Sequence, residues 1–265
     1  MSESGLRAVE VLVDRCADVI TSLTPAEWEM PSRCAGWSVK DLVAHASSNV
    51  HVVVEPGITP ADPPPIAEDL QHLLVVQRRD WTSQQVTEEF QDHRDAFLAA
   101  IAAVQKEPLA SSPLTMSELG TYPMHRLADA FAFDLWCHLY IDLLAPTGPV
   151  RRPVPEPEDD LLQPAIGWML AGLPQMCPSV TKVLDRPIAL HLTGPGGGRW
   201  TLEPGEPNLN VTEDSSNETN VAATVSSSAV DFVLWGTTRS PWRDAVELGG
   251  DTAYAEQVLD EVNIV

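Results

Sequence analysis

Basic residues are scarce in this sequence. It has 16 Lys and Arg against 38 Asp and Glu, which gives a formal net charge of −22 at pH 7. Proteins that bind nucleic acids neutralise phosphates with basic patches, and basic segments also drive binding to anionic membrane surfaces. The charge therefore argues against nucleic acid and against an anionic membrane as partners. We interpret the excess of acidic residues as a solvated surface that keeps the protein soluble.

Long apolar runs are also missing. No stretch approaches the length needed to span a bilayer, and residues 1–5 are polar and acidic with no apolar signal region behind them. The cysteines are scattered, without a CxxC pair or the framework of a disulfide-rich protein: Cys16, Cys34, Cys137 and Cys177. We therefore expect reduced thiols and a cytoplasmic location.

Two common catalytic motifs are incomplete. The glycine-rich residues 194–198 lack the Lys-Ser/Thr pair that completes a phosphate-binding loop, so we interpret them as a hairpin turn. The serines at 226–228 are not framed by Gly-x-Ser-x-Gly, the elbow that presents a nucleophile. We expect these serines to cap the following helix.

The chain is long enough for one large domain or two ordinary ones. It has 265 residues, of which 44% are hydrophobic and 20% charged, as in globular proteins. In the first half, apolar residues recur at intervals of three and four, which predicts amphipathic helices. Thr24 and Ser38 are in position to cap two of them. An antiparallel four-helix bundle is the economical architecture, with helical segments over residues 6–20, 38–54, 70–77, 82–105 and 124–144.

Proline separates this region from a different second half. The proline-rich residues 145–157 predict a linker, which places the domains at 1–146 and 161–265 with the linker over 147–160. The later domain is expected to be a small α/β domain, so the fold class of the chain is α+β. Its strands are predicted over residues 187–193, 199–203 and 221–225, and its helices over 226–235 and 252–262.

Two distant segments together carry candidate ligands for one metal ion. Residues 36–45 begin a helix that carries His45, and Asp134 and His138 follow about ninety residues later. Positions four apart share one face of a helix, so Asp134 and His138 can point at one place, where His45 can meet them from a facing helix. Two imidazoles and a carboxylate leave one coordination position open, as in catalytic zinc sites. The alternative is that His138 is a core histidine satisfied by a backbone carbonyl, with Asp134 at a wet helix edge.

The same segments resemble a known family. Residues 23–28 (Leu-Thr-Pro-Ala-Glu-Trp) and 36–45 (Gly-Trp-Ser-Val-Lys-Asp-Leu-Val-Ala-His) are similar to the opening of the mycothiol-dependent maleylpyruvate isomerase family, one of the DinB-like metal-binding helical bundles. Asp134 and His138 match its downstream acidic-x-x-x-His element. The resemblance covers nearly the whole chain, because residues 231–236, Arg239 and 249–251 fit the small C-terminal domain of the family.

The resemblance implies His45, Asp134 and His138 as zinc ligands, and Arg239 as a catalytic or cofactor-binding residue suited to a carboxylate. Two departures affect this expectation. The family usually has glutamate where this chain has Asp134, and the shorter side chain requires a closer approach of the helix. The family also has aspartate three residues after the second histidine, where this chain has Ile141 followed by Asp142, so the orienting role of that aspartate is left open here.

The resemblance implies a zinc-dependent enzyme that uses a low-molecular-weight thiol, mycothiol, on a small electrophilic substrate. A coordinated thiol loses its proton and becomes nucleophilic at neutral pH. The thiolate then isomerises a double bond or transfers its sulfur, and the ligand set does not separate these outcomes. The alternatives are metal-assisted hydrolysis at the same site and a non-catalytic binding or regulatory protein that has lost the metal.

Overall fold

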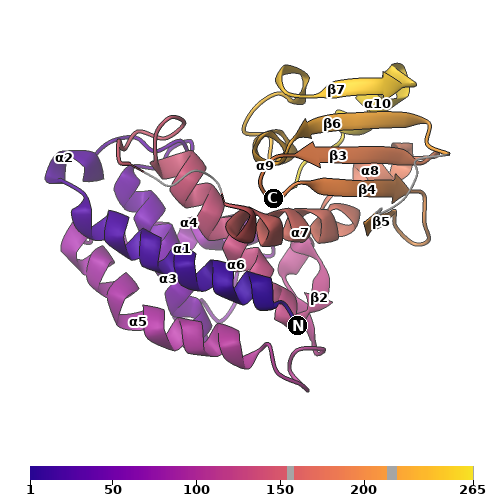
Figure 1. Ribbon diagram of the computed structural model, residues 1–265. Coiled ribbons are helices and arrows are strands. Elements are labelled where there is room, and N and C mark those ends of the chain that lie inside the picture. The colour runs from indigo at the N-terminus through magenta and orange to yellow at the C-terminus, as the bar shows by residue number, and fades with distance from the viewer. Residues whose placement is uncertain (154–157, 214–219, 265) are drawn as a thin grey trace. The chain divides into compact units, whose positions relative to one another are not determined.

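The computed structural model describes residues 1–153, 158–213 and 220–264 (Figure 1). The chain divides into two compact units, Met1–Glu156 and Pro157–Val265, and each is described by itself. Part of the predicted linker, residues 154–157, lies outside the described residues. Its last two positions, Asp159 and Asp160, belong to the first turn of a helix and not to a linker.

The first unit is helical. Its long helices pack in pairs, α3 against α5 and α1 against α6 and α5, with apolar side chains between them. A short hairpin of β1 (Pro113–Thr115) and β2 (Thr121–Pro123) precedes α6. The helices are α1 (Glu3–Ser22), α2 (Pro25–Trp28), α3 (Val39–Val54), α4 (Ala67–Val76), α5 (Ser83–Ala103) and α6 (Leu127–Trp136), with short 3₁₀ turns at Pro56–Ile58, Ser117–Leu119 and Met124–Arg126.

Helix α3 begins where the sequence predicts. The Ser38 hydroxyl accepts a hydrogen bond from the Asp41 backbone N–H, and the Asp41 carboxylate accepts one from the Ser38 backbone N–H. This capping box satisfies two backbone donors that a helix start otherwise leaves unpaired. Thr24 and Glu27 form the same arrangement at α2. The start of α3 is therefore fixed seven residues before His45.

Helix α6 continues directly into a segment with a different helical winding. From Cys137 to Leu143 the backbone is π-helical (η4), with hydrogen bonds that span one residue more than in an α-helix. Such insertions are rare and concentrate at functional sites. The expected single helix over 124–144 is thus a 3₁₀ turn, an α-helix and a π-helix in succession, and the wider last part carries His138 and Asp142.

The second unit is built on a mixed sheet with the strand order β5-β4-β3-β6-β7. Strand β3 forms an antiparallel hairpin with β4. On its other side β3 pairs in parallel with β6, which follows β4 and β5 in the chain. Its elements are α7 (Asp159–Met176), α8 (Pro178–Val183), β3 (Ile188–Thr193), β4 (Gly198–Glu203), β5 (Asn210–Glu213), β6 (Ala223–Ser228), α9 (Ala229–Gly236), a 3₁₀ turn at Trp242–Asp244, β7 (Glu247–Gly250) and α10 (Thr252–Leu259).

The predicted α+β class is confirmed, and so is the hairpin around residues 194–198. The helix predicted from residue 226 is wrong at its start, because residues 226–228 continue strand β6 and only Ser228 caps α9. Ser227 is buried there, and its hydroxyl donates to the Ala245 carbonyl and accepts from the Trp235 indole N–H. Among the residues that the structure describes, no helix combines the length and apolar character that crossing a bilayer requires.

The cap of α3 generates a stability prediction. Ser38→Ala removes the capping hydroxyl and is expected to lower the free energy of unfolding by about 1 kcal/mol, measured by urea denaturation. Ser83→Ala is the matched control, because Ser83 begins α5 but Thr82 provides its cap. Equal losses in the two variants would show that the Ser38 cap contributes nothing specific.

Candidate metal centre

His45, Asp134 and His138 meet inside the helical unit. His45 Nε2 lies 3.3 Å from Asp134 Oδ1, and His138 Nε2 lies 3.4 Å from the same oxygen. The two imidazole rings face each other edge to face with centroids 4.6 Å apart. His45 comes from α3, Asp134 from α6 and His138 from η4. The structure therefore brings together the three residues that the sequence pattern singles out.

The shorter Asp134 side chain reaches both histidines. His45 is buried, whereas the side chains of His138 and Asp134 keep 15% and 25% of their surface exposed. The centre is thus closed on the side of α3 and accessible on the side of Asp134. Aspartate in place of glutamate does not prevent the three donors from converging.

Charge is divided unequally between the two histidines. Burial lowers the pKa of His45 and favours its neutral form. Burial also acts to lower the pKa of His138, but the Asp134 charge and hydrogen bonds to Asp134 and Asp142 outweigh it and raise that pKa well above its usual value. Burial likewise opposes ionisation of Asp134, yet both histidines hold its pKa well below the usual range. Without a metal, the centre is an imidazolium–carboxylate pair beside a neutral imidazole.

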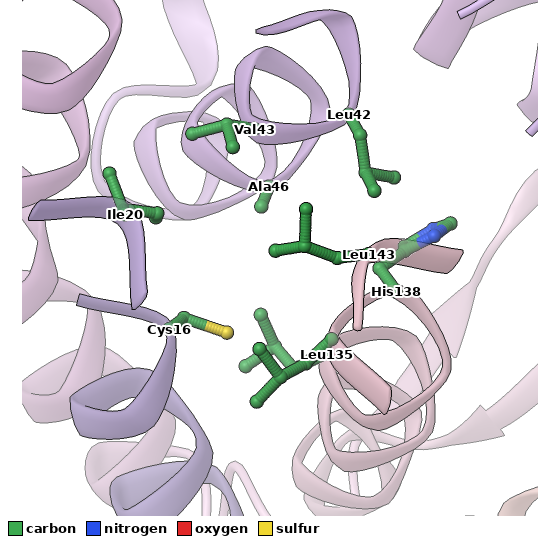
Figure 2. Close-up of a pocket in the computed structure, with 9 residues that line it drawn as sticks. Cys16, Ile20, Leu42, Val43, Ala46, Leu135, His138 and Leu143 are labelled. Atoms are coloured by element: carbon green, nitrogen blue, oxygen red, sulfur yellow. The ribbon is translucent and has the colours of Figure 1, made fainter. Parts of the chain in front are cut away.

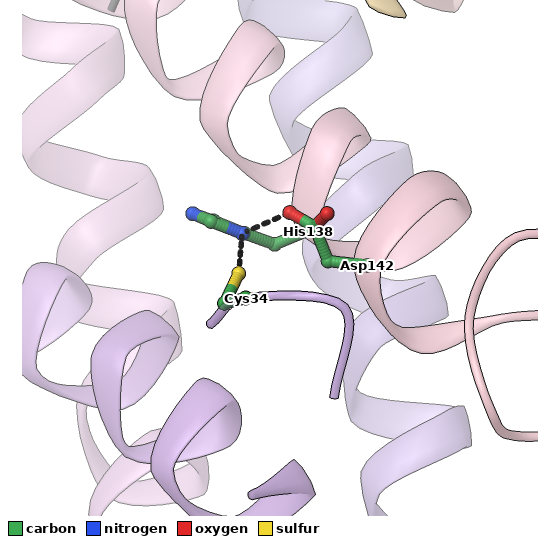
Figure 3. Close-up of side chains that lie close together, drawn as sticks. All are labelled: Cys34, His138 and Asp142. Carbon is green, nitrogen blue, oxygen red and sulfur yellow. Dashed lines mark hydrogen bonds and ion pairs between the residues drawn. The ribbon is translucent and has the colours of Figure 1, made fainter. Parts of the chain in front are cut away.

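Asp142 orients His138 (Figure 3). Its Oδ2 atom lies 2.9 Å from Nδ1 of His138, on the ring edge opposite Asp134. His138 and Asp142 lie four residues apart within the π-helical segment. Asp142 is buried, so its carboxylate is shielded from solvent where it meets His138. The orienting role left open by the sequence is therefore filled by Asp142.

Cys34 approaches the same ring edge. Its Sγ atom lies 3.9 Å from Nδ1 of His138, and the two side chains and Asp142 form one group in Figure 3. The sequence offers no signal for this approach, because Cys34 lies in the loop before α3 and belongs to no ligand motif. Cys34 faces Nδ1, so it contacts His138 from the side that points away from His45 and Asp134.

Asn49 and Trp37 complete the surroundings of His45. The Asn49 side-chain amide lies 3.2 Å from Nε2 of His45 and 3.3 Å from Oδ2 of Asp134. The Trp37 ring lies 5.3 Å from the His45 ring, centroid to centroid. Asn49 is four residues after His45 on α3, so helical spacing puts the two side chains on the same face. The sequence pattern did not single it out because asparagine is a less common metal ligand than histidine or aspartate.

His138 also lines a small apolar cavity (Figure 2). Its volume is about 20 Å³, and its walls include Cys16, Ala46, Leu135 and Leu143. A cavity of this size holds about one water molecule, so it is too small to hold a substrate. Burial, with the nearby Asp134 charge, raises the pKa of the Cys16 thiol to about 12. Cys16 therefore remains a neutral thiol and acts as a packing residue.

The donor spacing is compatible with a metal ion among the three side chains. Tetrahedral ligands about 2.0–2.1 Å from zinc are about 3.3–3.4 Å apart, as are the contacts of Asp134 Oδ1 with the two imidazoles. Charge-assisted hydrogen bonds are shorter, about 2.7–2.9 Å. With a metal on both Nε2 atoms, the ring protons occupy Nδ1. Asp142 accepts that proton on His138, whereas Nδ1 of His45 is buried without a partner among the described residues.

Arg239 belongs to the second unit and lies just after α9. Its backbone N–H donates to the Leu234 carbonyl at 2.8 Å, which closes the turn that follows the helix. The preceding Thr238 has a positive φ of 56°, a backbone conformation that side chains other than glycine rarely adopt. The turn thus holds a half-buried arginine at a defined place in that unit, and its catalytic role stays a prediction.

A helical unit with a histidine–aspartate–histidine centre, followed by a mixed α/β unit, defines a two-unit α+β class of protein. The family model described as the mycothiol maleylpyruvate isomerase N-terminal domain matches residues 9–140, and that described as the MDMPI C-terminal domain matches residues 168–257. The chain therefore belongs to the mycothiol-dependent maleylpyruvate isomerase family, a family of enzymes. Membership supports thiol-dependent isomerisation as the type of reaction.

Solved structures show the same fold. A crystal structure of the mycothiol-dependent maleylpyruvate isomerase superposes with a TM-score of 0.60 at 15% identity, and that of a histidine-to-alanine mutant of the isomerase with 0.59 at 16%. Each comparison covers 94% of this chain and 93% of the other. A comparison with curated proteins finds no match. At these identities the structural likeness establishes the fold, and the details of the site depend on the residues described above.

The charge distribution predicts a histidine with an unusual titration. In metal-free protein, His138 is expected to remain an imidazolium above pH 7, because its folded-state pKa is raised above about 6.5. The stability it contributes is then fully present below about pH 6.5 and is lost as pH rises through the raised pKa. Asp134→Asn removes the main cause that raises this pKa and is expected to lower it relative to the wild-type protein, as measured by NMR of the imidazole signals. An unchanged pKa in this variant would contradict the assignment.

Proposed function

We propose that this protein is a zinc-dependent isomerase that uses a low-molecular-weight thiol such as mycothiol on a small electrophilic substrate. His45, Asp134 and His138 hold the metal. Family membership supports the thiol and the isomerisation, and the spacing of 3.3–3.4 Å between Asp134 Oδ1 and the two imidazoles is the observation that supports zinc. Three protein ligands leave the open position that catalytic zinc requires.

The residues of the chain have separable tasks in this proposal. His45 and His138 provide neutral imidazole nitrogens, and Asp134 provides the single negative charge of the ligand set. Asp142 holds the remaining proton of His138 on Nδ1, which fixes the tautomer that leaves Nε2 free for the ion. The Asn49 amide supports Asp134 through Oδ2 and leaves Oδ1 to the centre. Zinc, when bound, lowers the pKa of a coordinated thiol and holds it as a thiolate.

We propose the cis double bond of an unsaturated, carbonyl-bearing acid as the reacting group. Addition of the thiolate sulfur forms one carbon–sulfur bond and converts the double bond into a single bond that can rotate. Expulsion of the same sulfur restores the double bond in the trans form, so no atom or electron is gained or lost. Arg239 is suited to bind a carboxylate of the substrate or of the thiol, because its guanidinium can form two parallel hydrogen bonds with it.

Turnover of maleylpyruvate in the presence of mycothiol tests the proposal. The zinc-loaded protein is expected to convert this substrate to its trans isomer only when the thiol is present, followed by ultraviolet absorbance. His45→Ala and His138→Ala are expected to lower kcat/KM by at least about a hundredfold, because each removes a metal ligand. His125→Ala is the control, since the half-buried His125 bonds to the Ala110 carbonyl and lies outside the centre.

The outcomes distinguish the alternatives. Thiol-independent loss of substrate would indicate metal-assisted hydrolysis at the same residues. A thiol adduct that accumulates stoichiometrically would indicate S-transfer. Full activity in both ligand variants would contradict a metal-dependent reaction at this centre.

The contact between Asp142 and His138 predicts an effect on metal affinity. Asp142→Asn keeps the shape of the side chain but weakens the hydrogen bond that fixes the His138 tautomer. Zinc affinity is expected to fall by about 10–100-fold, measured by competition with a chromogenic chelator. Asp92→Asn, an exposed aspartate on α5, is the control. If the two variants bind zinc equally well, Asp142 does not orient a metal ligand.

A further inference from the structure

A second cluster of metal-ligating side chains lies where the end of α3 meets α5. His51 is in the last turn of α3, Glu55 follows that helix, and His93 is on α5. One ligand atom from each of the three residues lies within 4.8 Å of the other two. The two imidazole rings stack with centroids 3.8 Å apart, and His51 Nε2 is 3.5 Å from Glu55 Oε2. The donors thus come from the end of α3 and from α5 and lie close together, and a turn of one stacked ring would let both imidazoles face one ion.

Both histidines are oriented by the same residue, Glu89. Nδ1 of His51 contacts the Glu89 carboxylate at 2.7 Å, and Nδ1 of His93 contacts the Glu89 backbone carbonyl at 2.8 Å. Both partners are acceptors, so each Nδ1 carries the ring proton and each Nε2 presents its lone pair. Histidines that bind metals characteristically donate their other ring N–H to a carboxylate or a backbone carbonyl. The orienting contacts of a metal site are therefore present for both rings.

Glu89 is itself held rigidly. It is buried, and the Arg78 guanidinium donates hydrogen bonds to both of its carboxylate oxygens. Nε lies 2.6 Å from Oε2, and Nη2 contacts Oε1. The Ser47 hydroxyl donates to Oε2 at 2.6 Å. Burial opposes the ionisation of Glu89, but the hydrogen bonds from Arg78, Ser47 and His51 outweigh it and lower the pKa of the carboxyl. A rigid support of this kind reduces the ordering cost of binding an ion.

We propose that His51, His93 and Glu55 form a second, independent site for a divalent transition-metal ion of the zinc class. Two imidazole nitrogens and a carboxylate oxygen suit Zn²⁺, Ni²⁺ and Cu²⁺ and do not suit Mg²⁺ or Ca²⁺, which prefer oxygen ligands alone. The Glu55 side chain is 64% exposed, so water completes the coordination. His51 follows His45 by six residues on α3, which places the two clusters about 9 Å apart along the helix and on different faces.

Zinc binding by the full-length, metal-free protein tests this site, measured by calorimetry and by equilibrium dialysis. The wild-type chain is expected to bind two equivalents. His93→Ala and Glu55→Gln are each expected to weaken one of them by at least about tenfold and to leave the other intact. His138→Ala is expected to retain the equivalent that these variants weaken. His93 is only half-buried and Glu55 is exposed, and a thermal melt followed by circular dichroism checks that each variant folds.

The two proposals fail in different ways. One equivalent in the wild-type chain that is lost in His138→Ala and unaffected in His93→Ala would overturn the second site and leave the first. One equivalent that is lost only in His93→Ala would support the second site and contradict the first. Binding unchanged in His93→Ala and Glu55→Gln alike, or binding lost equally in the control His125→Ala, would also overturn the second site.

Discussion

The centre depends on one carboxylate, Asp134, placed between two imidazoles. A half-buried negative charge is costly unless it is paired, and here two histidines from different segments share it through one oxygen. Burial lowers the pKa of His45 and favours its neutral form, whereas Asp134 and Asp142 outweigh burial at His138 and raise its pKa. The contact between Asp134 and His45 also joins α6 to α3 at the centre.

The surrounding structure maintains this contact at both ends. The capping box of Ser38 fixes where α3 starts and therefore the position of His45. On the other helix, the π-helical turns carry His138 and place Asp142 over its ring.

Helical spacing predicts the parts of the structure that local residues determine. The pairing of Asp134 with His138, the cap at Ser38 and the hairpin of β3 and β4 all follow from patterns within a few residues, whereas the addition of His45 to the ligand set rested on the family resemblance. Helix α7 was not predicted, because Pro164 and Pro174 lie inside it and each removes a backbone donor. Strands β5 and β7 are short edge strands whose pairing is decided by neighbours distant in sequence. The contact of Cys34 with His138 and the hydrogen bonds of Glu89 also join residues distant in sequence, so only the tertiary structure shows them.

The most direct measurement of the central claim is a crystal structure of the protein with zinc, with anomalous differences collected at the zinc edge. The account predicts a peak about 2.0–2.2 Å from Nε2 of His45, Oδ1 of Asp134 and Nε2 of His138, with Asp142 still bonded to His138. A map with no peak among these three side chains, in crystals grown with excess zinc, would contradict it.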